Sequence, residues 1–310
     1  MENTRAKTTR NSLILLLTAT IWGMAFVSQS KGMDYMHPFT FNGVRSLIGA
    51  ASILVYILIS RKIAGDKAAK LDWKLNVRAG LLCGIFLTIA STLQQFGIKY
   101  TSVGKAGFIT TLYIIFVPMF GVFLKKKVAP VVWAAAGMAA VGMYLLCMTE
   151  SLRLGAGDIM VFLCAIAFAI QIMTVDHYAA RIDGAVVSCI QFTVCGVVCC
   201  IGALIWGQPT FGQIQEGLGA LLYAGVLSCG VGYTLQIVGQ KGLNPTVAAL
   251  IMSLESVIAT ISGWIAYKIG FLSTDQTLTP RQIAGCVIVF AAVILVQLPP
   301  EWFRFGKKND

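Results

Sequence analysis

The sequence predicts an all-α integral membrane protein in which ten transmembrane helices form two inverted five-helix repeats, with both termini in the cytoplasm. Three observations lead to this fold class. Ten apolar stretches fill the chain, part of the first half recurs in the second, and the positive charges are distributed unevenly between the stretches. Apolar residues make up 57% and charged residues 12% of the 310 residues, which leaves too little polar surface for a water-soluble protein.

Each apolar stretch is long enough to cross a bilayer, because about 20 helical residues span a hydrocarbon core about 30 Å thick. We expect the spans, in chain order, at residues 13–31, 38–60, 77–98, 104–124, 130–148, 155–175, 184–206, 217–238, 246–267 and 280–298. No connection between them is long enough to form a soluble domain. The nine cysteines all fall within spans and are interpreted as small apolar side chains, so we expect no metal and no cofactor.

The third and fourth spans recur as the eighth and ninth at a constant offset of 142 residues. Thr92-Leu93-Gln94, Gly97, Lys99, Ala106, Ile109, Leu112 and Gly121 return as Thr234-Leu235-Gln236, Gly239, Lys241, Ala248, Ile251, Leu254 and Gly263. Because five spans per half is an odd number, the second copy must cross the membrane upside down. We therefore expect two repeats, at residues 1–150 and 151–310, around a central site, an arrangement typical of secondary transporters.

The distribution of positive charge predicts the orientation. With the amino terminus inside, seventeen Lys and Arg residues lie on the cytoplasmic side and six lie outside, while Arg45 alone falls within a span. This bias predicts cytoplasmic termini and explains the net charge of +11 without a nucleic-acid partner. A cleavable signal peptide is rejected, because removal of the first span would destroy the five-plus-five pairing.

Glu255 is the most informative polar residue because it lies near the centre of the ninth span. A charged side chain there costs roughly 2.5–3.5 kcal/mol on insertion scales. Three roles stay open at this point. Glu255 could exchange a proton and so couple proton movement to solute movement, it could form a purely structural hydrogen bond while protonated, or it could bind a cationic solute.

The repeat indicates further candidates for a central site. The offset places Tyr113 opposite Glu255 and Thr111 opposite Ser253, so both pairs would line the site if the axis relating the halves passes through it. Trp22 and Tyr233 could stack on a ring or a cation of the solute, although aromatic residues in membrane helices more often serve packing. This gives six candidate binding or coupling residues: Glu255, Tyr113, Trp22, Thr111, Ser253 and Tyr233.

Four other residues are candidates for gates, and one is a candidate hinge. Gln94 and Gln236 are equivalent but fall in the outer and inner thirds of their spans, as two gates would. A weaker alignment at an offset of 146 relates Arg45 to Gln191 in the same way. Arg45 could hold an anionic solute group, pair with an acidic residue or extend to the outer headgroups. Pro118, inside the fourth span, could be a hinge or a fixed bend.

These features resemble the drug/metabolite transporter superfamily, specifically its EamA-type members with ten helices. The resemblance is carried by Trp22-Gly23-Met24-Ala25-Phe26, Arg45, the run from Gln94 through Ile109 to Pro118, and Leu254-Glu255-Ser256-Val257 with Gly263-Trp264. It covers nearly all of the chain. It implies a cavity lined mainly by spans one, three, four, six, eight and nine, through which metabolites or drugs move by alternating access.

The sequence departs from this family at the ends of spans four and nine. Many members have a Gly-Glu pair there, whereas this chain has Lys125-Lys126-Lys127 and Tyr267-Lys268. The resemblance therefore assigns no role that depends on those glutamates.

The leading hypothesis is a secondary active transporter or exporter of a small organic metabolite, such as an amino acid, an amine or a related drug-like solute, in a bacterial plasma membrane. Its partners would be the solute, membrane lipids and, through Glu255, protons; a monomer and a homodimer both stay open. A membrane enzyme is disfavoured because His37 and His177 lie at opposite membrane faces and no catalytic constellation is present. A non-transporting scaffold or sensor would leave the central polar residues dispensable.

Overall fold

A computed structural model describes residues 2–65, 71–101, 103–125, 128–147, 155–272 and 277–297. This part of the chain forms helices joined by short connections and contains no strand. The elements are α1 (Glu2–Gly32), α2 (Pro38–Ala64), α3 (Trp73–Tyr100), α4 (Val103–Thr111), α5 (Tyr113–Phe123), α6 (Pro130–Cys147), α7 (Ala156–Tyr178), α8 (Gly184–Gly202), η2 (Ala203–Gly207), α9 (Phe211–Glu216), α10 (Leu218–Leu222), η3 (Tyr223–Gly232), α11 (Tyr233–Gln240), α12 (Pro245–Met252), α13 (Glu255–Lys268) and α14 (Pro280–Gln297).

Eight helical segments of the described chain are long and apolar enough to cross a membrane, and they coincide with predicted spans one to four and six to nine. Predicted spans five and ten coincide with shorter apolar helices at Pro130–Gly142 and Pro280–Leu295. The all-helical, multi-pass fold class is therefore confirmed. The count of ten spans stays a prediction, and the predicted boundary between the repeats, at residues 150 and 151, lies outside the described residues, as do Lys126 and Lys127.

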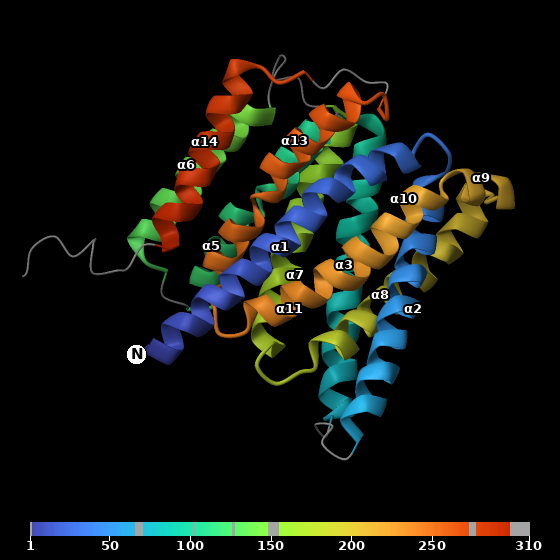
Figure 1. Cartoon of the computed structure of the whole chain (residues 1–310), viewed down its shortest axis with the longest axis horizontal. Helices are drawn as coiled ribbons and strands as arrows, with labels where there is room; N and C mark the ends of the chain where they lie inside the picture. The colour runs from blue at the N-terminus through green and yellow to red at the C-terminus, as the bar shows by residue number, and fades with distance from the viewer. Residues whose placement is uncertain are drawn as a thin grey trace, which may run out of the picture.

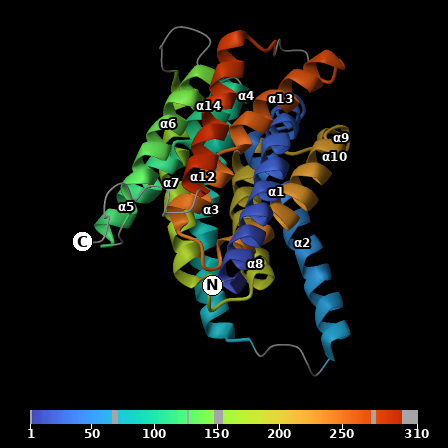
Figure 2. The same ribbon diagram turned by 60° about the vertical axis from the view of Figure 1, so that its left-hand side comes forward.

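The helices form a tilted bundle in which α3 packs against both α7 and α8, while α2 lies along α8 and η3. α6 and α14 pack on each other at one side of the bundle (Figures 1 and 2). α1 begins at the end of the bundle where α2 ends and α3 begins, and α14 runs back toward that end (Figure 1). The cytoplasmic assignment of that end stays a prediction.

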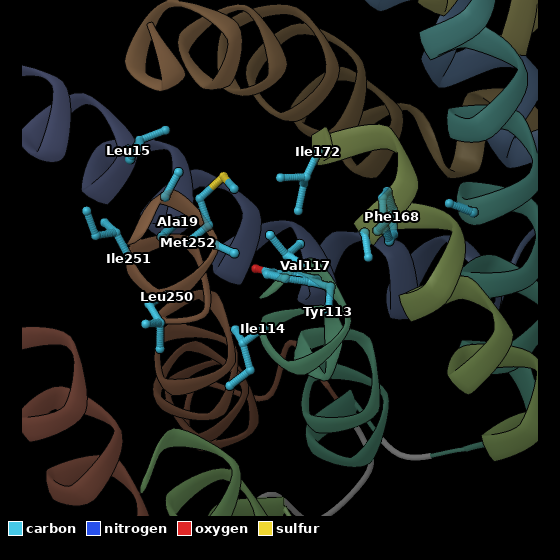
Figure 3. Close-up of a cluster of buried hydrophobic side chains, with 14 of the residues drawn as sticks. Leu15, Ala19, Tyr113, Ile114, Val117, Phe168, Ile172, Leu250, Ile251 and Met252 are labelled. Atoms are coloured by element: carbon cyan, nitrogen blue, oxygen red, sulfur yellow. The ribbon is translucent and has the colours of Figure 1, made fainter. Parts of the chain in front are cut away.

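The largest apolar cluster lies in the middle of the bundle, between α1, α5, α7 and α12. Figure 3 shows Leu15 and Ala19 of α1 facing Met252 of α12, with the ring of Tyr113 lying between these helices and α7. Packed apolar side chains therefore surround the ring of Tyr113 and fix the position of its hydroxyl group. This cluster positions the site described below.

The connection between α1 and α2 contains an ionisable residue whose environment predicts a pH dependence. Nδ1 of His37 accepts a hydrogen bond from the backbone N–H of Phe39 at 3.4 Å, which caps α2, and the ring lies edge-on to Phe96. Burial, and then the nearby charge of Lys99, lower the pKa of His37 from its ordinary value of 6.5. The unfolded chain therefore binds the proton more readily, so acidification through this value favours unfolding.

We expect the thermal unfolding midpoint of the purified protein to fall by a few degrees between about pH 8 and about pH 5, in part through His37. His37→Asn should show a smaller fall, because Asn keeps an acceptor for the helix cap but does not titrate. An equal fall in both proteins would show that His37 contributes nothing to the acid sensitivity.

Candidate substrate-binding site

Two membrane helices are interrupted at positions that the repeat relates. In the fourth span, α4 ends at Thr111 and α5 begins at Tyr113. In the ninth span, α12 ends at Met252 and α13 begins at Glu255. An offset of 142 carries Tyr113 onto Glu255, so the two breaks are equivalent. Broken helices near the middle of the membrane are a common setting for solute sites in transporters. Each break places one candidate residue at the start of a half-helix.

Thr111 and Ser253 lie at the breaks, and their hydroxyl groups bond to the backbone. Thr111 Oγ1 donates to the carbonyl oxygens of Gly107 and Phe108 at 3.0 and 2.9 Å, and Ser253 Oγ donates to that of Leu250 at 2.7 Å. Such back-bonding competes with the regular helical ladder and bends helices. Both side chains are fully buried, and neither is among the residues that line the central cavity.

Tyr113 and Glu255 meet directly. The hydroxyl group of Tyr113 donates a hydrogen bond of 3.0 Å to Oε1 of Glu255, and both side chains are buried. Two equivalent residues of an inverted repeat can touch only where the axis relating the halves passes between them. The hydrogen bond therefore marks the place where the two repeated segments face each other.

A small cavity of about 40 Å³ opens beside this hydrogen bond. Seven sequence-predicted residues line it: Trp22, Arg45, Gln94, Tyr113, Tyr233, Gln236 and Glu255. They come from α1, α2, α3, α5, α11 and α13, so segments far apart in the chain converge here. Gln191 and Pro118 are buried within α8 and α5 and are not among the lining residues.

Aromatic rings form one wall of the cavity. The rings of Trp22 and Tyr233 lie 4.5 Å apart between centroids, and Phe192 packs edge-on to Tyr233 at 5.0 Å. Nε1 of Trp22 donates to the carbonyl oxygen of Ser228 at 3.4 Å. Ser228 belongs to η3, a π-helical stretch, and wide helical turns of this kind are frequent at functional sites. The wall offers flat apolar faces to a ring, an aliphatic group or a cation.

The cavity contains one acidic and one basic side chain, and neither has an ionic partner among the residues that the structure describes. Arg45 is 6% exposed, its guanidinium lies 5.4 Å from the ring centroid of Phe41, and its Nε has no hydrogen-bond partner. The described part of the chain has an ion pair between Lys31 and Asp34, outside the cavity, and this pair involves neither Glu255 nor Arg45. Buried charges are normally paired, so both groups are available to a ligand of complementary charge.

Four glutamines add amide groups to the lining. Nε2 of Gln94 donates to Oγ1 of Thr110 at 3.2 Å, and Nε2 of Gln236 donates to Oε1 of Gln171 at 3.3 Å. Among the described residues, no hydrogen-bond partner is found for three buried amide atoms: Oε1 of Gln236, Nε2 of Gln171 and Oε1 of Gln29. Gln29 and Gln171 were not among the residues predicted from the sequence to form the site. Their amides inside apolar spans are the signal that could have identified them.

The interruption of the fourth span does not lie at Pro118. α5 continues through Pro118 to Phe123, and the break precedes it at Leu112. In the ninth span, the residue equivalent to Pro118 is Thr260, so the equivalent break forms without a proline at that position. The hinge role of Pro118 stays a prediction, and the paired breaks are additional points at which these spans could bend.

Comparison with known proteins agrees with this architecture. The model of the EamA-like transporter family matches the chain twice, at residues 10–148 and 155–298. The chain belongs to the EamA-like transporter family. It is 28% identical to an uncharacterized transporter of Archaeoglobus fulgidus over 92% of this chain and 84% of that protein. It is 24% identical to the uncharacterized transporter YwfM of Bacillus subtilis, over 94% of each chain.

A solved crystal structure, 16% identical, superposes on this EamA-like chain with a TM-score of 0.73 and covers 96% of it and 99% of the other chain. At this level of sequence identity, the similarity shows a shared fold and nothing further. The family and the names of its relatives indicate a membrane transporter of the drug/metabolite type rather than an enzyme. The chain is a multi-pass membrane protein, and its bacterial relatives support a plasma-membrane location.

Proposed function

We propose that this protein is a secondary active transporter that carries a small zwitterionic metabolite, such as an amino acid, across the plasma membrane by alternating access. The observation that carries the proposal is that Glu255 and Arg45 line one cavity without an ionic partner in the described chain. A solute with an ammonium and a carboxylate group would neutralise both buried charges. An amine alone would leave Arg45 unpaired, and an organic acid alone would leave Glu255 unpaired.

Glu255 also supplies a route to proton coupling. A carboxylate sealed in an apolar bundle requires either a proton or a cationic group. In this proposal Glu255 holds a proton when the cavity is empty and exchanges it for the ammonium group of the solute. The hydroxyl group of Tyr113, which already donates to Glu255, keeps the carboxyl oriented toward the cavity. Solute and proton would then move in opposite directions.

The size of the cavity supports a conformational cycle. A volume of about 40 Å³ is far below the roughly 300–1,000 Å³ that sites for small organic ligands usually offer. The helices must therefore separate to admit a solute. We propose that the two inverted repeats, with both termini cytoplasmic, rock about the axis at Tyr113 and Glu255, and that Gln94 and Gln236 contact the solute on opposite sides of it.

The proposal is tested by the uptake of labelled leucine into proteoliposomes, with two analogues as competitors. The analogues are the amine that leucine gives on loss of its carboxyl group and the acid that it gives on loss of its amino group. We expect leucine to enter faster than into protein-free vesicles and each analogue to compete at least about tenfold more weakly than leucine itself. Uptake of the amine without uptake of the amino acid would instead favour an amine transporter in which Arg45 has no part in binding.

A further inference from the structure

A second, larger cavity of about 600 Å³ lies apart from the central one, between the ends of α2, α3, α8 and α11. It shares no lining residue with the central cavity. α2 packs closely on η3 but makes few contacts with α11, which continues the same span (Figure 1). The groove lies at the end of the bundle where α1 begins, beside the end of α2 and the start of α3. We refer to it as the α2–α11 groove.

Three cationic side chains from different segments line the α2–α11 groove. Arg61 comes from the last turn of α2, Arg181 from the turn between α7 and α8, and Lys241 from the residue after α11. Lys241 Nζ donates to the carbonyl oxygen of Ile182 at 3.3 Å, and Arg181 contacts the imidazole and carbonyl oxygen of His177. These partners are neutral or weakly basic groups, so they do not neutralise the positive charge.

The two acidic residues of the groove cap helices. Oδ1 of Asp72 accepts from the backbone N–H of Leu75 at 2.9 Å at the start of α3. Oδ1 of Asp183 accepts from those of Ala185 and Val186 at 3.0 and 3.2 Å at the start of α8. Neither carboxylate lies within ion-pair distance of a described cation. The groove therefore keeps a local excess of positive charge.

The walls of the groove are apolar beside these charges. Tyr56 and Ile57 line it from α2 and Val238 lines it from α11, and the neighbouring Leu58 and Ile59 of α2 are exposed on the outside of the bundle. Cationic groups at one end of a membrane groove and apolar walls along it match a phosphate headgroup and an acyl chain. A free inorganic anion would use the cations but would leave the apolar walls without a contact.

We propose that the α2–α11 groove binds an anionic phospholipid, with its phosphate among Arg61, Arg181 and Lys241 and an acyl chain along α2 and α11. The site is independent of the solute cavity and of the transport proposal. A lipid held between α2 and α11 would occupy the gap that these two helices leave. Basic pockets between membrane helices are known to bind acidic headgroups.

The test compares two variants with the same loss of charge at the same end of the bundle. The groove variant carries Arg61→Gln, Arg181→Gln and Lys241→Gln, and the control carries Lys62→Gln, Lys74→Gln and Arg78→Gln at exposed cations outside the groove. Each purified protein is equilibrated with phosphatidylglycerol or with phosphatidylcholine of the same acyl chains, and retained lipid is counted by native mass spectrometry. We expect the wild type and the control to retain phosphatidylglycerol about tenfold more than phosphatidylcholine, and the groove variant to lose this preference.

Equal loss of the preference in both variants would overturn the proposal, because it would reflect general attraction to a basic surface. No preference in the wild type would also overturn it. Competition by millimolar inorganic phosphate or glycerol phosphate as strong as that by phosphatidylglycerol would assign the groove to a free phosphate instead of a lipid. If the triple groove variant does not fold, Arg61→Gln against Lys62→Gln gives the same comparison, because the Arg61 side chain makes no hydrogen bond or ion pair within the described part of the chain.

Discussion

Replacing Glu255 with Gln is expected to lower solute flux by at least about tenfold and to abolish its stimulation by an imposed pH gradient. Gln has the shape of Glu and can still accept the hydrogen bond from Tyr113, so the fold should survive. It can neither carry the exchanged proton nor pair with an ammonium group. The measurement is uptake into proteoliposomes with and without a pH gradient.

Tyr113→Phe is the matched control for Glu255→Gln. It removes the 3.0 Å hydrogen bond that Glu255→Gln keeps, and it leaves the carboxyl group in place. We expect a smaller loss of flux and a retained response to the pH gradient. Full activity and full gradient response in Glu255→Gln would remove Glu255 from the mechanism and would favour the purely structural role.

Replacing Gly23 with Val is expected to destabilise the protein by roughly 2–3 kcal/mol and to remove transport. α1 crosses α13 at Gly23, where a Cβ atom would lie 2.6 Å from Cβ of Ile258 and 2.7 Å from the carbonyl oxygen of Glu255. A carbonyl group of the helix backbone cannot rotate away, so the two helices must separate. This separation would displace both Trp22 and Glu255 from the cavity.

Gly137→Val in α6 is the control, because a Cβ atom there meets no described atom within 4 Å. Both substitutions place a β-branched residue inside a helix, so the intrinsic cost is shared. Thermal unfolding in detergent should show a much lower midpoint for Gly23→Val than for Gly137→Val. Equal midpoints would contradict the close approach of α1 to α13.

The position of the membrane helices could be predicted from the sequence, because the hydrocarbon core requires long apolar stretches whatever the rest of the fold does. The pairing of Tyr113 with Glu255 also followed from the sequence, since the repeat relates these positions. Arg45 could be identified from the sequence as a candidate site residue, because it is the one basic residue inside a predicted span. Its place in the cavity, rather than at the headgroups, depends on how α2 packs against η3.

The breaks in the fourth and ninth spans could not be predicted from hydropathy. The hydroxyl groups of Thr111 and Ser253 donate hydrogen bonds to backbone carbonyl oxygens of their own helices. These bonds change the hydrogen-bond pattern of the helix without changing the apolar character of the span. The weaker alignment related Gln191 to Arg45, but the two residues have different surroundings in the structure. Arg45 lines the cavity, whereas Gln191 is buried within α8 and does not line it. Equivalence in a repeat gives a similar place in the fold but not the same access to the site.

In the proposed mechanism, the cavity around Glu255 and Arg45 binds a zwitterionic solute. The most direct measurement is thermal unfolding of the detergent-purified protein against amino acids, amines and organic acids, because a ligand that binds only the folded state raises the midpoint. We predict that an amino acid raises the midpoint of the wild type but not that of Glu255→Gln or Arg45→Gln. An amino acid that stabilises all three proteins equally would place the binding site elsewhere and would contradict this account.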